Sequence, residues 1–244
     1  MAKYKTLWKW MIIPLLVMQA GIFYDYWGDF SENTWAVHVH YWLASAWYVM
    51  LMSQPWLFAK GNLDAHRTWG IFGMALAGGL AFTSISQFNR DLTYANAARD
   101  NPADWLPFTE WFFIMILLFE LILITSFIVA VSMSILRRKS AEDHAWWLVS
   151  TVFILLMPAV ARGLEALWIA IYGFDTTEAD LVMDPLYVSQ GFIIALTLAS
   201  AAWLGKLRHP ATYLAVGANA ALFLMVPVSK IQGVQELLRT IIAV

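Results

Sequence analysis

Long apolar segments recur along this chain, and they restrict its possible folds more than any other feature of the sequence. A helix needs about 20 predominantly apolar residues to cross the hydrocarbon core of a bilayer, and several segments reach or approach that length. Backbone groups in lipid must find hydrogen-bond partners within the segment, so these segments are expected to be helices. The sequence therefore predicts an all-α, polytopic membrane bundle of about seven transmembrane helices, at approximately residues 8–25, 36–58, 67–87, 109–136, 145–172, 186–204 and 211–229.

The composition agrees with a membrane protein. Hydrophobic residues make up 61% of the 244 residues and charged residues only 13%, whereas a soluble domain carries about 25% charged residues. The absence of cysteine from the sequence excludes disulfides, iron–sulfur clusters and thiolate-ligated haem. The longest basic run, Arg137-Arg138-Lys139, is too short to indicate a nucleic acid partner. The expected surroundings are therefore a lipid bilayer.

The distribution of lysine and arginine predicts the orientation of the bundle. Most of the 15 basic residues fall on one side of the predicted spans: Lys3, Lys5, Lys9, Lys60, Arg67, Arg137, Arg138, Lys139, Lys206 and Arg208. The other side carries a smaller set: Arg90, Arg99, Lys230 and Arg239. Because basic residues concentrate in cytoplasmic loops, the N-terminus is expected in the cytoplasm and the C-terminus outside, as in a multi-pass protein of a bacterial inner membrane.

The whole chain, residues 1–244, is expected to form one transmembrane domain. The first apolar segment is predicted to be a transmembrane helix and not a cleaved signal peptide, because no small-residue cleavage site follows it. The longest connection, residues 88–108, is expected to hold one surface helix that ends near Asn101 and Pro102. Residues 231–244 are expected either to lie in the outer interface as an amphipathic helix or to continue the last span past a kink.

Three charged residues fall inside the predicted spans: Glu120, Arg162 and Glu165. Charged groups are costly within a membrane and usually mark functional sites. Arg162 and Glu165 are three residues apart, so an ion pair across one helical turn is the simplest structural explanation for them. Glu120 has no partner nearby in the sequence. It is expected to be protonated, to pair with Arg162 or to belong to a proton path.

Four histidines lie at the ends of predicted helices. His66 and His144 stand at the inner ends of two helices, whereas His38 and His40 stand at the outer end of another. Helical residues two positions apart point about 200° apart, so His38 and His40 are not expected to bind one metal together. The histidines therefore predict two separate sites, about 30 Å apart across the bilayer.

One arrangement of these residues is a haem protein. His66 and His144 would bind one haem b through their imidazoles, and the small side chains along residues 66–84 would leave room for the macrocycle. On the outer side, His40 with Arg162 and Glu165 would form a polar site for a quinone, another substrate or a metal. His40 is thus a third candidate cofactor-binding histidine.

Other arrangements remain open from the sequence alone. An outer metal site would combine His38 or His40 with Glu110 or Glu165, a ligand set that suits iron or copper. The histidines and carboxylates would alternatively form a proton relay. The simplest explanation for any single histidine is that it caps a helix and contacts lipid headgroups.

Two short motifs resemble those of a group of uncharacterised bacterial multi-pass membrane proteins. They are His66-Arg67-x-x-Gly70 and His144-x-x-Trp147, the second of which opens a helix that contains Arg162. That group has methionine where this chain has Leu148, and the likeness covers about residues 35–172. The histidine arrangement also resembles small diheme b-type cytochromes, but the outer histidines here lack a second histidine partner. The resemblance implies membrane redox chemistry or haem handling.

The function expected from these residues is haem- or metal-dependent electron transfer in the membrane, in contact with quinol. If the chain is an enzyme, it is expected to be a membrane oxidoreductase. One alternative is a proton-coupled transporter or channel that uses Glu120, Arg162 and Glu165. Another is an accessory subunit of a larger membrane complex or a homo-oligomer, in which exposed tryptophan and methionine side chains contact other subunits.

Overall fold

Every regular element in the described part of the chain is a helix, which confirms the predicted all-α class. A computed structural model describes residues 6–173 and 180–242. In chain order the elements are α1 (Leu7–Trp10), α2 (Ile12–Gly21), the π-helical η2 (Phe23–Gly28), the 3-10 helix η3 (Phe30–Glu32), α3 (Trp35–Ala59), α4 (Leu63–Asp100), α5 (Pro102–Trp105), α6 (Glu110–Leu136), α7 (Ala141–Tyr172), α8 (Asp180–Leu204), α9 (Pro210–Ala220), α10 (Leu222–Ser229) and α11 (Gln232–Ile242).

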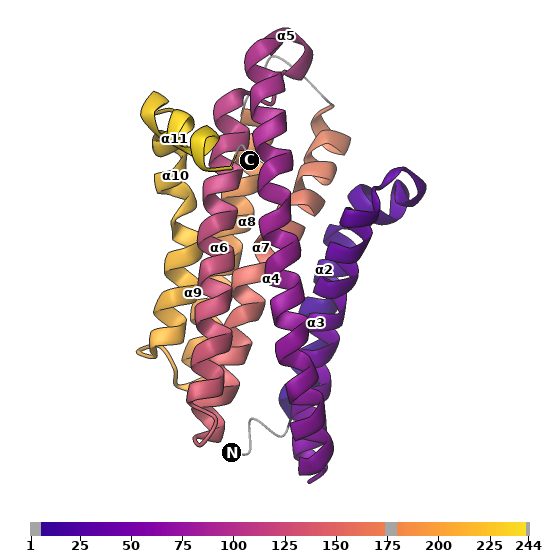
Figure 1. Cartoon of the computed structure of the whole chain (residues 1–244). Coiled ribbons are helices and arrows are strands. Elements are labelled where there is room, and N and C mark those ends of the chain that lie inside the picture. The colour runs from indigo at the N-terminus through magenta and orange to yellow at the C-terminus, as the bar shows by residue number, and fades with distance from the viewer. Residues whose placement is uncertain (1–5, 174–179, 243–244) are drawn as a thin grey trace.

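Five helical segments among these residues are long and apolar enough to cross a membrane. They are α4, α6, α7, Val182–Leu204 of α8, and Pro210–Ser229, which comprises α9 and α10. They run up and down along one bundle (Figure 1). The structure thus supports a multi-pass membrane protein, whereas the count of seven spans stays a prediction. Helices α1 and α2 are short and separated at Met11, and the 25-residue α3 is not among the five.

Helix α4 is much longer than expected from the sequence. Its 38 residues extend about 57 Å at 1.5 Å per residue, nearly twice the hydrocarbon thickness of about 30 Å. The predicted connection at residues 88–108 is therefore wrong over its first half, because the helix continues to Asp100. The buried residues in this stretch recur at helical spacing: Phe88, Asp91, Leu92, Ala95 and Ala98. Helix α4 ends at Asp100, close to Asn101 and Pro102, where a separate surface helix was predicted to end.

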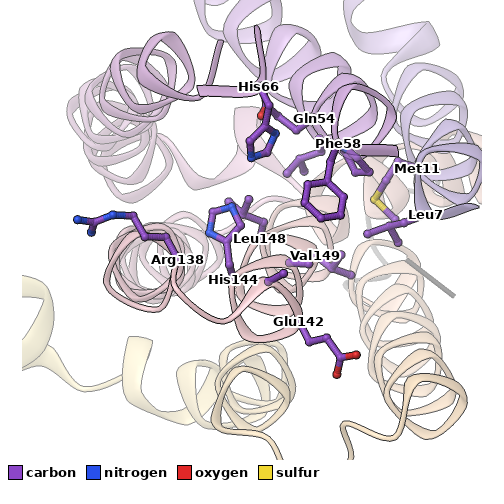
Figure 2. Close-up of a pocket in the computed structure, with 14 residues that line it drawn as sticks. Leu7, Met11, Gln54, Phe58, His66, Arg138, Glu142, His144, Leu148 and Val149 are labelled. Atoms are coloured by element: carbon purple, nitrogen blue, oxygen red, sulfur yellow. The ribbon is translucent and has the colours of Figure 1, made fainter. Parts of the chain in front are cut away.

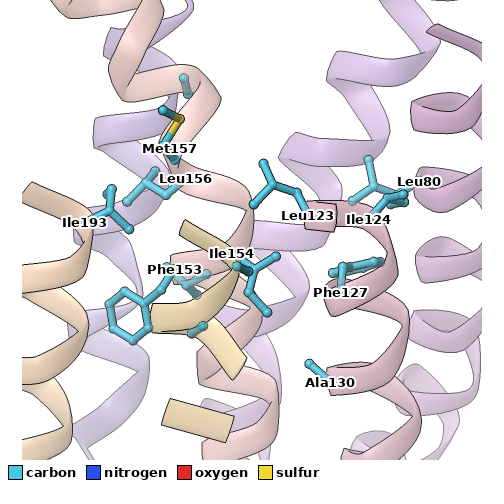
Figure 3. Packing of buried hydrophobic residues seen from close by; sticks show 14 of the residues in the cluster. Leu80, Leu123, Ile124, Phe127, Ala130, Phe153, Ile154, Leu156, Met157 and Ile193 are labelled. Atoms are coloured by element: carbon cyan, nitrogen blue, oxygen red, sulfur yellow. The ribbon is translucent and has the colours of Figure 1, made fainter. Parts of the chain in front are cut away.

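Helices α6 and α7 form the centre of the bundle. Helix α6 packs against α4, α7, α9 and α10, and α7 packs against α2, α6, α8 and α9. Figure 3 shows the buried apolar side chains of both helices, with Leu80 of α4 and Ile193 of α8 in the same cluster. Buried hydrogen bonds join α7 to α9: the Trp146 indole donates to Thr212 Oγ1 over 3.0 Å, and the Asn219 amide donates to the Phe153 carbonyl oxygen over 3.0 Å.

Helix α2 contacts α7 at the level of the backbone. A Cβ atom added to Gly21 would lie 2.2 Å from the Ala159 carbonyl oxygen, and one added to Gly163 would lie 2.9 Å from the Gly21 Cα. Small residues permit such close approaches between helices in membranes. The contact also holds η2, which follows α2, against the outer part of α7.

Basic residues gather at the end of the bundle where α3 ends and α4 begins (Figure 1). The turns at this end carry Lys60, Arg67, Arg137, Arg138, Lys139, Lys206 and Arg208. These residues of the predicted inner set are therefore grouped in space. Lys9 belongs to α1, and Lys3 and Lys5 lie outside the described residues. The direction in which the bundle crosses a bilayer stays a prediction. "Inner" below means this basic end, and "outer" means the opposite end.

The C-terminal residues form a separate helix. Helix α10 ends at Ser229 and α11 begins at Gln232, so the last span does not simply continue. Figure 1 shows α11 folded across the outer end of the bundle. Arg239 of α11 donates from Nε to Asn96 Oδ1 of α4 over 2.8 Å and from Nη2 to the carboxylate of Glu110 on α6. These bonds attach α11 to the bundle.

Replacing Arg239 with alanine is expected to release α11 while α4 and α6 keep their positions. Hydrogen bonds to a charged group contribute about 1.5–3 kcal/mol, so amide exchange in residues 232–242 should be roughly tenfold faster or more. Hydrogen–deuterium exchange with mass spectrometry measures this rate. Arg99→Ala is the matched control, because Arg99 is paired with the neighbouring Asp100 and, among the described residues, forms no hydrogen bond to α11. Unchanged exchange in α11 of the Arg239 variant would show that these bonds do not hold the helix.

Candidate functional site

His66 and His144 face each other at the inner end of the bundle (Figure 2). Asn62 caps α4 by accepting a hydrogen bond from the backbone N–H three residues later, and His66 follows in the first helical turn. Ser140 caps α7 in the same way, which places His144 in its first turn. Both caps are residue types that favour helix starts. The ring centres are 6.4 Å apart, and the ring planes are inclined by 82°.

The hydrogen bonding of these two rings leaves ring nitrogens available for a ligand. His144 Nδ1 lies 2.8 Å from the Ser134 carbonyl oxygen, which can only accept, so Nδ1 carries the proton and Nε2 of the neutral ring has a free lone pair. Metal-binding histidines are oriented by this kind of bond from the other ring nitrogen. His66 Nδ1 is buried and has no hydrogen-bond partner among the described residues.

A cavity of about 130 Å³ lies beside the two rings. Most of its wall is apolar and comes from α1, α3, α4 and α7. Its lining side chains include Met11, Leu51, Phe58, Arg138, Leu148 and Val149. The cavity therefore combines two imidazoles and apolar walls, which suit an apolar ligand that carries a metal, with the Arg138 guanidinium and the Glu142 carboxylate.

The outer histidines have other partners. His38 Nδ1 lies 3.1 Å from the Tyr26 hydroxyl. Burial raises the pKa of the Tyr26 phenol, so the phenol keeps its proton while it is hydrogen-bonded to His38. His40 Nδ1 lies 3.3 Å from Thr83 Oγ1. His40 thus sits in the outer half of α3 and is not among the residues that line the inner cavity.

The expected outer metal site of His38, His40, Glu110 and Glu165 finds no support in this geometry. Glu110 is paired with Arg239, and His38 and His40 are bonded to Tyr26 and Thr83. Residues 6–173 and 180–242 contain no group of three or more histidine or acidic side chains that could hold a metal ion.

Arg162 is paired with Asp25, a residue from η2. The distance from Arg162 Nε to Asp25 Oδ2 is 2.6 Å, and Arg162 forms no ion pair with Glu165 among the described residues. The pairing expected across one turn of α7 is therefore replaced by a contact between distant parts of the chain. The backbone contact between α2 and α7 causes it, because that contact brings η2 to the side of α7.

Glu120 faces a carboxyl group and is not an ion-pair partner of Arg162. Helices α4 and α6 pack along each other, and the Glu120 and Asp91 side chains interact directly. Asp91 Oδ1 accepts hydrogen bonds from Arg90, over 2.9 Å from Nε and 2.7 Å from Nη2. The sequence assigned Asp91 to a connection. The helical spacing of Phe88, Leu92 and Ala95 is the signal that would have placed Asp91 on a buried face.

Comparison with known proteins yields no family for this chain. No family model, no curated protein and no solved structure matches it. The resemblance through His66-Arg67-x-x-Gly70 and His144-x-x-Trp147 therefore rests on those short motifs, and the function must be argued from the site.

Proposed function

We propose that this chain is an electron-transfer protein of the bacterial inner membrane that binds one b-type haem between His66 and His144. The proposal rests on the facing imidazole rings of His66 and His144. Two imidazoles that bind one iron from opposite sides place their ring centres about 6 Å apart, because each metal–nitrogen bond is about 2 Å long. The separation here is 6.4 Å.

The donor set favours haem over a bare metal ion. A non-haem iron or copper centre needs more ligands than two imidazoles, and the described residues offer no larger group. A haem macrocycle brings its own equatorial nitrogens, so two axial histidines suffice. His144 is already oriented by Ser134, and His66 Nδ1 has no hydrogen-bond partner among the described residues, which leaves this nitrogen available to a metal.

The cavity must widen to admit the macrocycle. At about 130 Å³ it is smaller than the roughly 300–1,000 Å³ of most small-molecule sites. Phe58 on its wall is 37% exposed, and Arg138 is exposed as well. Both side chains can turn without disturbing the buried core, so binding is expected to move them and to leave the helices in place. Arg138 is also placed to pair with the haem carboxylates.

A bound haem would supply one-electron redox chemistry. The chain would contribute the two axial nitrogens, of which the His144 nitrogen is made more basic by the bond to Ser134. Leu51, Leu148 and Val149 would keep water from the iron. The proposed redox partner is a quinone in the bilayer, because apolar walls between membrane-spanning helices suit exchange with a lipid-soluble carrier.

A second candidate function is proton-coupled transport, and a different observation supports it. Glu120, Arg162 and Glu165 lie on helices long enough to span the membrane, and Glu120 meets Asp91 with buried oxygens that lack partners. Such groups are typical of proton pathways. The two functions are compatible, since membrane redox proteins often move protons with electrons.

Metal analysis of the purified full chain tests the haem proposal. We expect about one iron per chain, together with the absorbance spectrum of a protein-bound haem. His209→Asn is the control: His209 caps α9 outside the cavity, and asparagine preserves the cap, so the iron content should not change. A colourless preparation without iron, even after incubation with haem, would contradict the proposal.

A further inference from the structure

The carboxyl groups of buried Asp91 and half-buried Glu120 meet between α4 and α6 in the outer half of the bundle. The Asp91 side chain is only 3% exposed, and Glu120 approaches it from the neighbouring helix. Asp91 Oδ2 and Glu120 Oε2 are both buried and have no hydrogen-bond partner among the described residues. Ionised carboxylate oxygens only accept hydrogen bonds, so two ionised groups cannot satisfy each other.

The two arginines near Asp91 and Glu120 are already engaged in ion pairs. From α4, Arg90 bonds to Asp91 Oδ1. From α7, Arg162 is paired with Asp25 of η2 and also interacts electrostatically with Glu120 and Asp91. Helix α3 contributes His40, which is close to both arginines.

The other helices packed on α6 add no cation near this pair. Helix α9 contains only Tyr213 as a titratable residue, at its inner end, and the sequence of α10 has none. Helix α7 also carries Glu165, a further carboxyl group beside Arg162. Among the described residues, Glu120 therefore forms no ion pair with an arginine. If Asp91 and Glu120 were both ionised, one negative charge would remain uncompensated.

We propose that Asp91 and Glu120 together bind one exchangeable proton. One carboxyl group is then an acid that donates its O–H to the other, which stays ionised and remains paired with Arg90. This single proton provides a partner for both orphaned oxygens, and it removes the repulsion that two adjacent buried carboxylates would suffer. The ligand of this site is the proton itself, and neither haem nor a metal is required.

The surroundings connect the pair to the outer surface. Arg162 interacts with Glu120 and Asp91 on one side and with Asp25 on the other. The Asp25 side chain is 53% exposed, so this ion pair joins the buried carboxyls to the outer face. The proton held by Asp91 and Glu120 therefore lies near an ion pair that reaches the outer face.

Infrared spectroscopy of the purified full chain at pH 7 tests the proposal. Because Glu165 is another partly buried carboxyl group, the spectra are recorded in the Glu165→Gln background, which should show the carbonyl stretch of one protonated carboxylic acid. The band should be lost in Asp91→Asn and equally in Glu120→Gln, because either change removes the partner that keeps the proton in place. Glu236→Gln, which alters an exposed carboxylate on α11, should leave the band unchanged.

Any other result of this measurement would contradict the proposal. A Glu165→Gln spectrum without the band would show that no proton is held. A band that persists in Asp91→Asn would show that Glu120 is protonated alone, and persistence in Glu120→Gln would assign the proton to Asp91 alone. If a variant does not fold, as judged by circular dichroism, Glu120→Asp replaces it and should keep the band at a shifted frequency. The band should also shift after transfer into D₂O within minutes, and an unshifted band would refute exchange.

Discussion

Replacing either His66 or His144 with alanine is expected to abolish stable haem binding. Each ring would supply one nitrogen ligand, and no other imidazole lines the cavity among the described residues. Loss of residues that merely orient a metal ligand already lowers metal affinity about 10–100-fold, so loss of a ligand should exceed about 100-fold. Titration of the purified variants with haem, followed by absorbance, measures the affinity.

A conservative change at the same position separates ligation from folding. His66→Met should still bind haem, because a thioether is an axial ligand in c-type cytochromes, and the reduction potential should rise. A redox titration of the two proteins gives this difference. An unchanged potential in His66→Met, or haem affinity that survives His144→Ala, would show that these side chains do not hold the iron.

Replacing Gly21 with alanine is expected to displace α2 from α7. The new Cβ atom would lie 2.2 Å from the carbonyl oxygen of Ala159 and 2.6 Å from its carbon, and neither backbone atom can move aside alone. Overpacking of this kind costs about 1–3 kcal/mol. Because η2 follows α2, the ion pair between Asp25 and Arg162 should lengthen as well. The thermal unfolding midpoint in detergent, measured by circular dichroism, should fall.

Gly78→Ala is the matched control for this change. Gly78 lies in α4, and an added Cβ atom would meet nothing within 4 Å, so the higher helix propensity of alanine should leave stability equal or slightly raised. A Gly21 variant as stable as the wild-type protein would show that α2 does not pack on α7 as described.

The sequence predicts the helical class and the position of most helices because apolar length and the need for internal hydrogen bonds leave few alternatives. It also predicts that His66 and His144 lie at the same end, since topology alone determines which helix ends are neighbours. The seven-span count is less well determined, because α1, α2 and α3 lack the combined length and hydropathy of the other spans.

Contacts between distant residues were beyond prediction from spacing. Arg162 is three residues from Glu165, yet its partner is Asp25, which a backbone contact at Gly21 brings close. The burial of Asp91 in α4 is missed for another reason. The polar residues around it suggest a loop, although every third or fourth residue is apolar and continues the helix. The spacing of the apolar residues, and not the local polarity, determines the secondary structure of this stretch.

The coordination of the iron tests the central claim most directly. Electron paramagnetic resonance of the ferric, haem-loaded full chain should show a low-spin iron with two imidazole ligands. The same measurement on His66→Ala and on His144→Ala should show loss of the low-spin signal in each. A low-spin signal that persists in both single variants, or a wild-type chain that binds no haem, would contradict the account.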